Sequence, residues 1–222
     1  MNMKNPGWAF VFLITLTGCD WKEWKAARAQ GEPDRTFTTV SYNYTPDILH
    51  WITFKNSSLP FKIDEAPYGG STYGPNGSEM ALDNGEKVRY SADNCCFMWS
   101  GPLDKPQRIR VVWLVIHNLS YFNRQADEGY DERTSRKNPP GGRWCQAIVD
   151  IQPATGPDRP KMVFLHFLAD GSVQAKLGTF LTAKPLPSAQ VKSHSAPLPE
   201  GQVCKNEIDN PWYGIPRKPH RE

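Results

Sequence analysis

The segment Arg108-Ile109-Arg110-Val111-Val112-Trp113-Leu114-Val115-Ile116-His117 gives the strongest strand signal in the sequence. It begins with alternating charged and apolar residues and ends as an uninterrupted apolar run. Such a run is typical of a strand that is covered on both faces, whereas strict alternation is typical of a strand with one face in water. The segment therefore predicts a strand whose later part is buried on both faces.

Similar strand-like runs lie on both sides of this segment. They are rich in β-branched and aromatic residues and are bounded by turn residues. In residues 48–55, alternation places the even-numbered side chains, those of Ile48 and His50 among them, on one side of the strand. Asp170-Gly171 lies between two such runs and predicts a β-hairpin. The strand-like runs cover residues 36–44, 48–55, 94–99, 145–151, 161–168 and 172–178.

The composition is also typical of short strands joined by turns. The chain of 222 residues contains 20 Pro and 17 Gly, and 12% of its residues are aromatic. We therefore expect an all-β fold, in which residues 36–182 form an antiparallel β-sandwich-like domain with long loops. Proline cannot pair within a central strand, so residues 183–222 predict a Pro-rich C-terminal tail, which Cys204 could pin to the domain.

The N-terminal segment has the pattern of an export signal. One positive charge is followed by an apolar run from Trp8 to Leu16, by small residues and by Cys19. This run of nine residues is far shorter than the roughly 20 that a membrane-spanning helix needs. The pattern predicts a lipoprotein signal peptide over residues 1–18, acylation of Cys19, for example with palmitate, and a membrane tether over residues 19–35. The alternatives are an uncleaved anchor and a chance cysteine after an apolar run.

The same signal predicts a membrane-anchored lipoprotein that faces the periplasm. Asp20, directly after the acylated cysteine, slightly favours the inner over the outer membrane. The net charge is +3, and removal of Lys4 with the signal peptide leaves the chain near neutral. Because nucleic acids bind strongly basic surfaces, we expect no nucleic-acid partner.

Four cysteines remain besides Cys19, namely Cys95, Cys96, Cys145 and Cys204. In an oxidising compartment an even number of cysteines favours disulfides. A bond between the neighbours Cys95 and Cys96 would close a small strained ring, so we expect each of them to pair with Cys145 or Cys204. Free buried thiols are the alternative. No CxxC or HxxxH spacing indicates zinc, and we expect no metal site.

No catalytic motif stands out in the sequence. The glycine-rich loop of residues 68–77 lacks the Gly-Lys of a phosphate-binding loop and the spacing of a GxSxG elbow. His50 and His166 lie in predicted strands without a nucleophile motif, so we interpret them as structural. We expect no enzymatic activity and no cofactor, and an extracytoplasmic hydrolase is the disfavoured alternative.

An ordered set of segments resembles a known family. The set comprises the lipobox that ends at Cys19, Ser41-Tyr42-Asn43-Tyr44-Thr45 leading to Ile48-Leu49-His50, a glycine-rich segment, the vicinal Cys95-Cys96, Ile109-Arg110-Val111-Val112-Trp113, and His166-Phe167-Leu168-Ala169-Asp170-Gly171-Ser172-Val173. In these segments the chain is similar to the lipoprotein family of type VI secretion lipase immunity proteins.

This resemblance implies a protein that binds and neutralises a cognate phospholipase effector in the periplasm, while anchored to the membrane through its N-terminal lipid. The role would be recognition without catalysis. The alternative is a structural or assembly lipoprotein of the envelope, which binds another envelope component and has no toxin-neutralising role.

Two loops supply candidate partner-binding residues. The polar stretch of residues 121–143 is longer than most loops, and such length is typical of functional or disordered segments. Aromatic and arginine side chains commonly anchor protein interfaces. The candidates are Tyr130, Arg133, Arg136 and Trp144 in and beside this stretch, and Tyr68 and Tyr73 in the glycine-rich loop. The alternative for both loops is a solvated segment without a binding role.

Overall fold

The computed structural model describes residues 36–73, 78–99, 105–125, 127, 129–153, 160–182 and 184–217, with the side chains of residues 92, 93 and 180 excepted. The predicted signal peptide, Cys19 and the tether lie outside these residues. Within the described ranges, no helix has the length and apolar character needed to cross a membrane. The tail belongs to the same compact unit as the strands.

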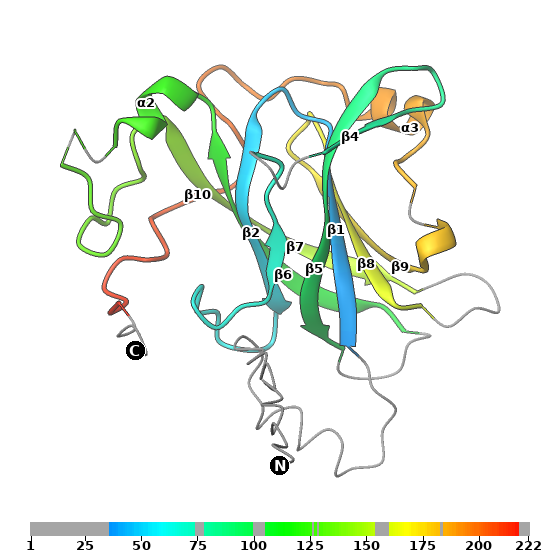
Figure 1. Cartoon of the computed structure of the whole chain (residues 1–222), viewed down its shortest axis with the longest axis horizontal. Helices are drawn as coiled ribbons and strands as arrows, with labels where there is room; N and C mark the ends of the chain where they lie inside the picture. Colours follow the sequence, from blue (N-terminus) through cyan, green and yellow to red (C-terminus); the bar gives the residue numbers. More distant parts are fainter. Residues whose placement is uncertain are drawn as a thin grey trace, which may run out of the picture. The chain divides into compact units, whose positions relative to one another are not determined.

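The protein is mostly strand, as the sequence predicted, and the all-β class is confirmed (Figure 1). Three short helical segments are described beside the strands: α2 (Leu119–Asn123), η2 (Phe180–Thr182) and α3 (Ser188–Ser193). The strands are β1 (Thr36–Asn43), β2 (Ile48–Asn56), β3 (Tyr68–Gly70), β4 (Ser78–Ala81), β5 (Lys87–Met98), β6 (Gln107–Ile116), β7 (Gly142–Gln152), β8 (Met162–Phe167), β9 (Val173–Gly178) and β10 (Glu207–Ile208).

The ten strands of the described residues belong to one continuous sheet with the order β3-β2-β6-β7-β9-β8-β1-β5-β4, and β10 pairs with β7 beside this path. Most neighbours pair antiparallel, but β1 pairs with β8, and β7 with β9, in parallel. The predicted hairpin at Asp170-Gly171 joins β8 and β9, which pair antiparallel. β6, the segment with the strongest strand signal, pairs with β2 on one edge and with β7 on the other.

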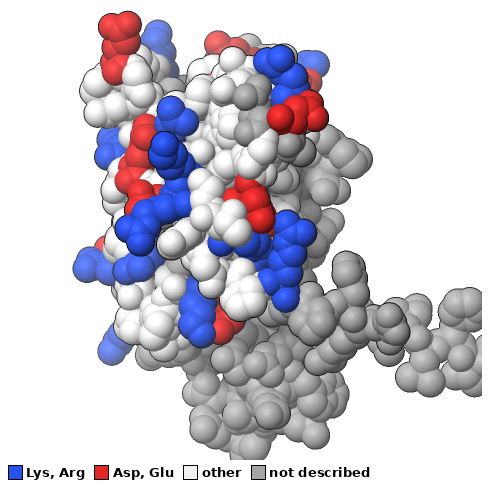
Figure 2. Space-filling model, turned by 90° about the vertical axis from the view of Figure 1, so that its left-hand side faces the viewer, with Lys and Arg blue, Asp and Glu red and all other residues white. Residues whose placement is uncertain are grey.

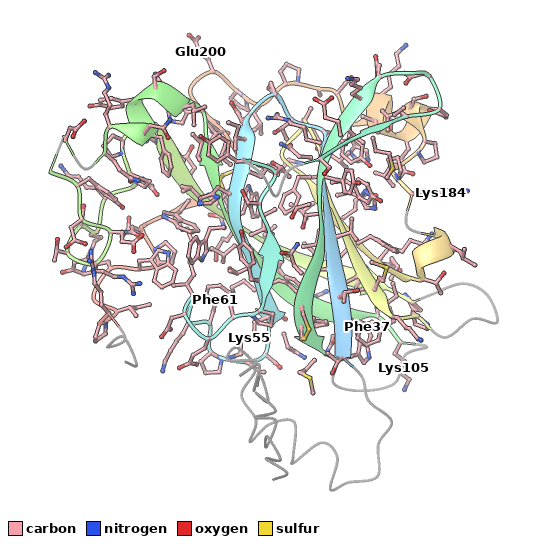
Figure 3. All side chains as sticks on the ribbon, viewed as in Figure 1. Phe37, Lys55, Phe61, Lys105, Lys184 and Glu200 are labelled. Atoms are coloured by element: carbon pink, nitrogen blue, oxygen red, sulfur yellow. A yellow bond between two sulfur atoms is a disulfide. The ribbon has the colours of Figure 1, made fainter. Side chains whose placement is uncertain are left out.

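The sheet curls so that its inner face encloses the main core (Figure 3). Distant strands meet there, since the rings of Phe54 in β2 and Phe97 in β5 are 4.9 Å apart. Short β3 lies against β1 and β5 at the closing edge. The Ser41 hydroxyl donates to the carbonyl of Gly69 at 2.7 Å. Gly70 has a φ of +104°, and a Cβ there would collide with the side chain of Ser91, so this close approach requires glycine.

β6 contributes to cores on both faces of the sheet. One alternating set of its side chains, which includes Val111 and Trp113, lies in the inner core. The other set lies in an outer cluster, which also contains Trp212 from the tail. The prediction that the later part of this strand is buried on both faces is therefore confirmed. The outer cluster comprises Ile63, Val112, Leu114, Ile116, Trp144 and Trp212.

The disulfide pairing differs from the expected one. The structure pairs Cys95 with Cys96, and Cys145 with Cys204, so the expectation that the vicinal cysteines bond to Cys145 or Cys204 is wrong. The physical reason is distance within the sheet. Cys145 is in β7, whereas Cys95 and Cys96 are in β5, and β9, β8 and β1 lie between these two strands. Cys204 instead lies beside β7, because the neighbouring β10 pairs with that strand.

We expect the Cys145–Cys204 bond to contribute substantially to stability. It links residues 59 apart and thereby restricts the unfolded chain, whereas the Cys95–Cys96 bond closes almost no loop. Replacing both Cys145 and Cys204 with Ala should lower the free energy of unfolding by about 2–4 kcal/mol. Urea denaturation under oxidising conditions measures this change.

The matched control replaces Cys95 and Cys96 with Ala, which should change the free energy of unfolding by less than about 1 kcal/mol. A larger loss in this control than in the Cys145/Cys204 variant would contradict the loop-length argument.

Candidate functional site: an aromatic and arginine surface

Trp51 is placed on the surface by an irregularity in β2. The pairing of β2 with β6 shifts between His50 and Thr53, so that β2 carries an extra residue there. Trp51 has a φ of +50°, the left-handed region that non-glycine residues seldom adopt, and its side chain is 38% exposed. The prediction that the even-numbered side chains of residues 48–55 lie on one side of the strand is therefore wrong. Leu49 joins Ile52 in the inner core, whereas Ile48 packs on the outer cluster.

The ring of Trp51 is at the centre of a group of aromatic side chains. It lies edge-on to His50 at 5.9 Å, to Tyr68 at 5.9 Å and to Trp212 at 5.3 Å. His50 in turn lies edge-on to Tyr73 and Phe122, and burial lowers the pKa of its imidazole. These contacts join β2, β3, α2 and the tail. We name this group the aromatic surface: His50, Trp51, Tyr68, Tyr73, Phe122 and Trp212.

A cavity of about 530 Å³ opens beside Trp51. Its walls bring together Tyr68 and Arg133, which come from the two loops that the sequence singled out. Asp64 supplies one carboxylate to the lining. The lining residues are Trp51, Thr53, Ile63, Asp64, Ala66, Tyr68, Arg133, Trp212 and Pro216.

The guanidinium group of Arg133 is held in place on three sides. Its central carbon lies 4.1 Å from the ring centre of Trp212, within the range of a cation–π contact. Its Nη1 donates to the carbonyl oxygen of Ile215 at 3.3 Å, and its Nε donates to Oε1 of Glu132 at 3.2 Å. The side chain of Arg133 is 21% exposed, so this cation is fixed at the surface and is not a freely moving side chain.

Asn210 organises the polar loop, which we define as residues 124–141. Its side chain is buried, and its Nδ2 lies within hydrogen-bonding distance of the Tyr130 hydroxyl, the Glu132 carbonyl and the Ser135 carbonyl, at 3.0, 2.6 and 2.8 Å. Its Oδ1 accepts from the backbone N–H of Trp212 at 3.0 Å. One side chain in the tail therefore fixes both the loop that carries Arg133 and the tryptophan beneath it.

The sequence-based candidates have different roles in the structure. Tyr68 and Arg133 line the cavity, and Tyr73 contacts His50. Arg136 lies over the ring of Tyr213, with 5.2 Å between its guanidinium carbon and the ring centre. These side chains are at the surface and can meet a partner.

Two further candidates support the surface from within. Tyr130 braces the polar loop, and burial, with a smaller contribution from Glu132 and Asp131, raises the pKa of its hydroxyl to about 12. Trp144 does not fit the expected role, because it is only 3% exposed and lies in the outer cluster. Trp212 of the tail, together with Phe61 and Ile63, covers this face of β7 and β6.

The sequence interpretation missed Trp51, Trp212 and Asn210 as parts of the site. Asn210 and Trp212 lie in Asp209-Asn210-Pro211-Trp212, where turn chemistry directly adjoins a large aromatic residue in the predicted tail. That combination is a weak local signal that the tail folds onto the domain. Nothing in the sequence marks Trp51 as part of a site. Residues 48–55 have the pattern of a regular strand, and the irregularity at Trp51 appears only in the structure.

A His–Asp–Ser group on the β8–β9 hairpin does not have the geometry of a catalytic triad. Nδ1 of His194 lies 2.9 Å from Oδ2 of Asp170 and 3.4 Å from the Ser172 hydroxyl, so both partners meet the same ring nitrogen. A triad needs the serine at the other nitrogen, and Nε2 here lies 3.2 Å from Gln174. Burial would raise the pKa of Asp170, but hydrogen bonds from Ser172 and His194 outweigh it and hold this pKa at about 2.

Among the described residues, no group of three or more His, Cys, Asp or Glu side chains is arranged to hold a metal ion. The chain matches no protein-family model, no curated protein and no solved structure in the three comparisons. The physical features of the aromatic surface are therefore the basis for assigning a function.

Replacing Asn210 with Ala should loosen the polar loop. The change removes the buried amide and leaves the carbonyl groups of Glu132 and Ser135 without this donor, which should lower the free energy of unfolding by about 1–3 kcal/mol. Hydrogen exchange should show faster exchange of backbone amides in residues 130–137.

Asn206 offers a matched control, because it is an exposed asparagine in the same tail. Asn206→Ala should change the free energy of unfolding by less than about 0.5 kcal/mol. If the two variants behaved alike, Asn210 would not organise the loop.

Proposed function

We propose that this protein is a lipid-anchored immunity protein, which binds and neutralises a type VI secretion phospholipase effector in the periplasm. The observation that carries the proposal is the aromatic surface with Arg133 and Arg136, because segments far apart in the sequence meet there and bring aromatic and arginine side chains together, with Trp51 and Tyr73 exposed. The resemblance of the ordered segments from Cys19 to Val173 to the lipase immunity family supplies the class of partner.

The composition of this surface suits protein recognition. Tryptophan, tyrosine and arginine are the residues that most often dominate binding energy at protein interfaces. Exposed aromatic side chains extend beyond the cavity, since Tyr121 and Tyr213 are also among the exposed large side chains. Contiguous apolar groups at a surface commonly mark an interaction site.

Contacts within the protein also hold parts of this surface in place without a partner. Asn210 fixes the polar loop, the cation–π contact fixes Arg133, and the Cys145–Cys204 bond fixes the tail. Because these groups are already held, binding through them loses less conformational entropy than binding by a flexible loop would. The left-handed backbone at Trp51 costs about 1–3 kcal/mol, and a binding role for the exposed ring gives that conformation a function.

Neutralisation would follow from occlusion alone. A protein bound over the active site of a phospholipase, or over its path to lipid, blocks the reaction without chemistry of its own. Acylation at Cys19 would hold the immunity protein at the membrane, where the effector must act, and would raise its local concentration. The Cys145–Cys204 pair agrees with an oxidising compartment such as the periplasm.

The proposal predicts that a secreted phospholipase is encoded beside this gene, and it is tested by directing that phospholipase to the periplasm of a Gram-negative host. Co-production of the wild-type protein should protect the cells, and Trp51→Ala should weaken the complex about 10- to 100-fold and reduce protection. Binding is measured by calorimetry on the purified proteins, and protection by survival of the host.

Ile148→Ala is the matched control, because Ile148 is an exposed apolar residue outside the aromatic surface, and it should leave affinity unchanged. Cys19→Ala should retain binding in solution and lose much of the protection. The immunity role is refuted if the wild-type protein neither protects nor binds at micromolar concentration. An envelope defect on deletion, with unchanged sensitivity to the phospholipase, would favour the structural or assembly lipoprotein instead.

A further inference from the structure

We propose that the cavity between Trp51, Tyr68, Trp212 and Arg133 receives a carboxylate of the partner protein, carried on a short apolar stem such as a glutamate side chain. This inference rests on the proposed function for the identity of the partner. It adds which feature of the partner is recognised and which atoms recognise it.

Arg133 lines the cavity, and its hydrogen bonds within the described residues use only part of the N–H donors of its guanidinium group. A guanidinium group carries five N–H donors. The hydrogen bonds described for Arg133 use Nε, toward Glu132, and one N–H of Nη1, toward Ile215. Within the described part of the chain, three N–H donors of Arg133 therefore have no protein acceptor recorded. A guanidinium fixed in position with several open donors is suited to bind an oxyanion through two parallel hydrogen bonds.

The remainder of the cavity is suited to an apolar stem. Three aromatic rings and Ile63, Ala66 and Pro216 supply most of the lining. The rings of Trp51 and Tyr68 meet at 62°, and those of Trp51 and Trp212 at 81°, so the walls are steeply inclined to one another. A volume of about 530 Å³ falls within the usual range of ligand sites and admits one side chain together with part of its backbone.

The charge of the lining favours a carboxylate over two other ligands with polar heads. Asp64 in the lining and Glu132 beside the guanidinium already offset part of the charge of Arg133, so a phosphate dianion would be repelled more strongly than a monoanion. A quaternary ammonium group would meet a like charge, because the guanidinium of Arg133 lies over the ring of Trp212 in the wall of the same cavity. A monoanion bound by one fixed guanidinium is the better match.

The surroundings favour a protein over a free metabolite as the source of this carboxylate. The cavity is continuous with the aromatic surface through Trp51 and Tyr68. Arg136 and Lys137 lie in the same polar loop, both exposed. Figure 2 shows Lys and Arg side chains on the side of the molecule that carries α2, the polar loop and the end of the tail, with Asp and Glu side chains between them. An acidic segment with an apolar neighbour would therefore meet complementary groups both in and around the cavity.

The first experiment uses the wild-type protein and a small probe. 3-Phenylpropanoate carries a carboxylate on an apolar stem, and its neutral amide, 3-phenylpropanamide, is the matched control. In ¹⁵N-resolved NMR, the carboxylate should bind with millimolar affinity, as expected of a small fragment, and should shift the Arg133 Nε–H signal and the indole signals of Trp51 and Trp212.

The amide should bind at least about 10-fold more weakly, because it lacks the charge-assisted hydrogen bonds. Equal binding of acid and amide would overturn the inference, as would shifts confined to other residues. Tighter binding of phosphocholine than of the carboxylate would also overturn it, in favour of a lipid headgroup.

The second experiment measures binding of the phospholipase to Arg133→Lys. Lysine keeps the charge and loses the bidentate geometry, so affinity should fall about 10- to 100-fold. Arg108→Lys is the control, since Arg108 is exposed and pairs with Asp150 at the start of β6. Thermal unfolding confirms that both variants are folded.

The two proposals fail in different ways. If the phospholipase binds the wild-type protein and Arg133→Lys within twofold, the cavity inference is overturned while the proposed function stands. If the wild-type protein does not bind the phospholipase, the proposed function fails, and the probe experiment alone decides whether the cavity accepts a carboxylate.

Discussion

Burial of β6 on both faces is the constraint on which the rest of this structure depends. Its inner side chains, such as Val111 and Trp113, fill the space enclosed by the curled sheet. Its outer side chains, such as Leu114, would face water if the sheet were the whole fold. Exposure of such a row of apolar side chains is costly, so another part of the chain must cover it. Trp212 of the tail, with Phe61 and Ile63, provides that cover.

The packing of the tail against β6 forms the candidate site as well as the outer cluster. Trp212 covers the outer face of β6 and at the same time supplies the ring on which Arg133 lies. Asn210, two residues earlier, links the tail to the polar loop. The recognition surface is thus built directly on the contact that completes the core. A change that detached the tail would remove the site and destabilise the fold together.

The clearest departure from local sequence rules lies within this surface. The irregularity in β2 breaks alternation at His50 and gives Trp51 a left-handed backbone. Natural sequences most often violate local rules at functional sites, where the surrounding structure over-determines the strained residue. The hairpin of β4 and β5 follows local rules but is absent from the strands that we predicted from the sequence. Its turn contains Asn84-Gly85, a strong hairpin signal that was present in the sequence.

The sequence by itself determined the all-β class, the buried character of β6, the hairpin at Asp170-Gly171 and the two loops that carry Tyr68 and Arg133. These features follow from periodicity and turn chemistry, which act over a few residues. Only the tertiary structure decided the strand order, the pairing of Cys145 with Cys204, the burial of Trp144 and the meeting of Trp51 with Trp212. Each of these depends on contacts between segments far apart in the chain. Local sequence patterns indicate which side chains must be buried, whereas the packing of the whole sheet decides which other residues bury them.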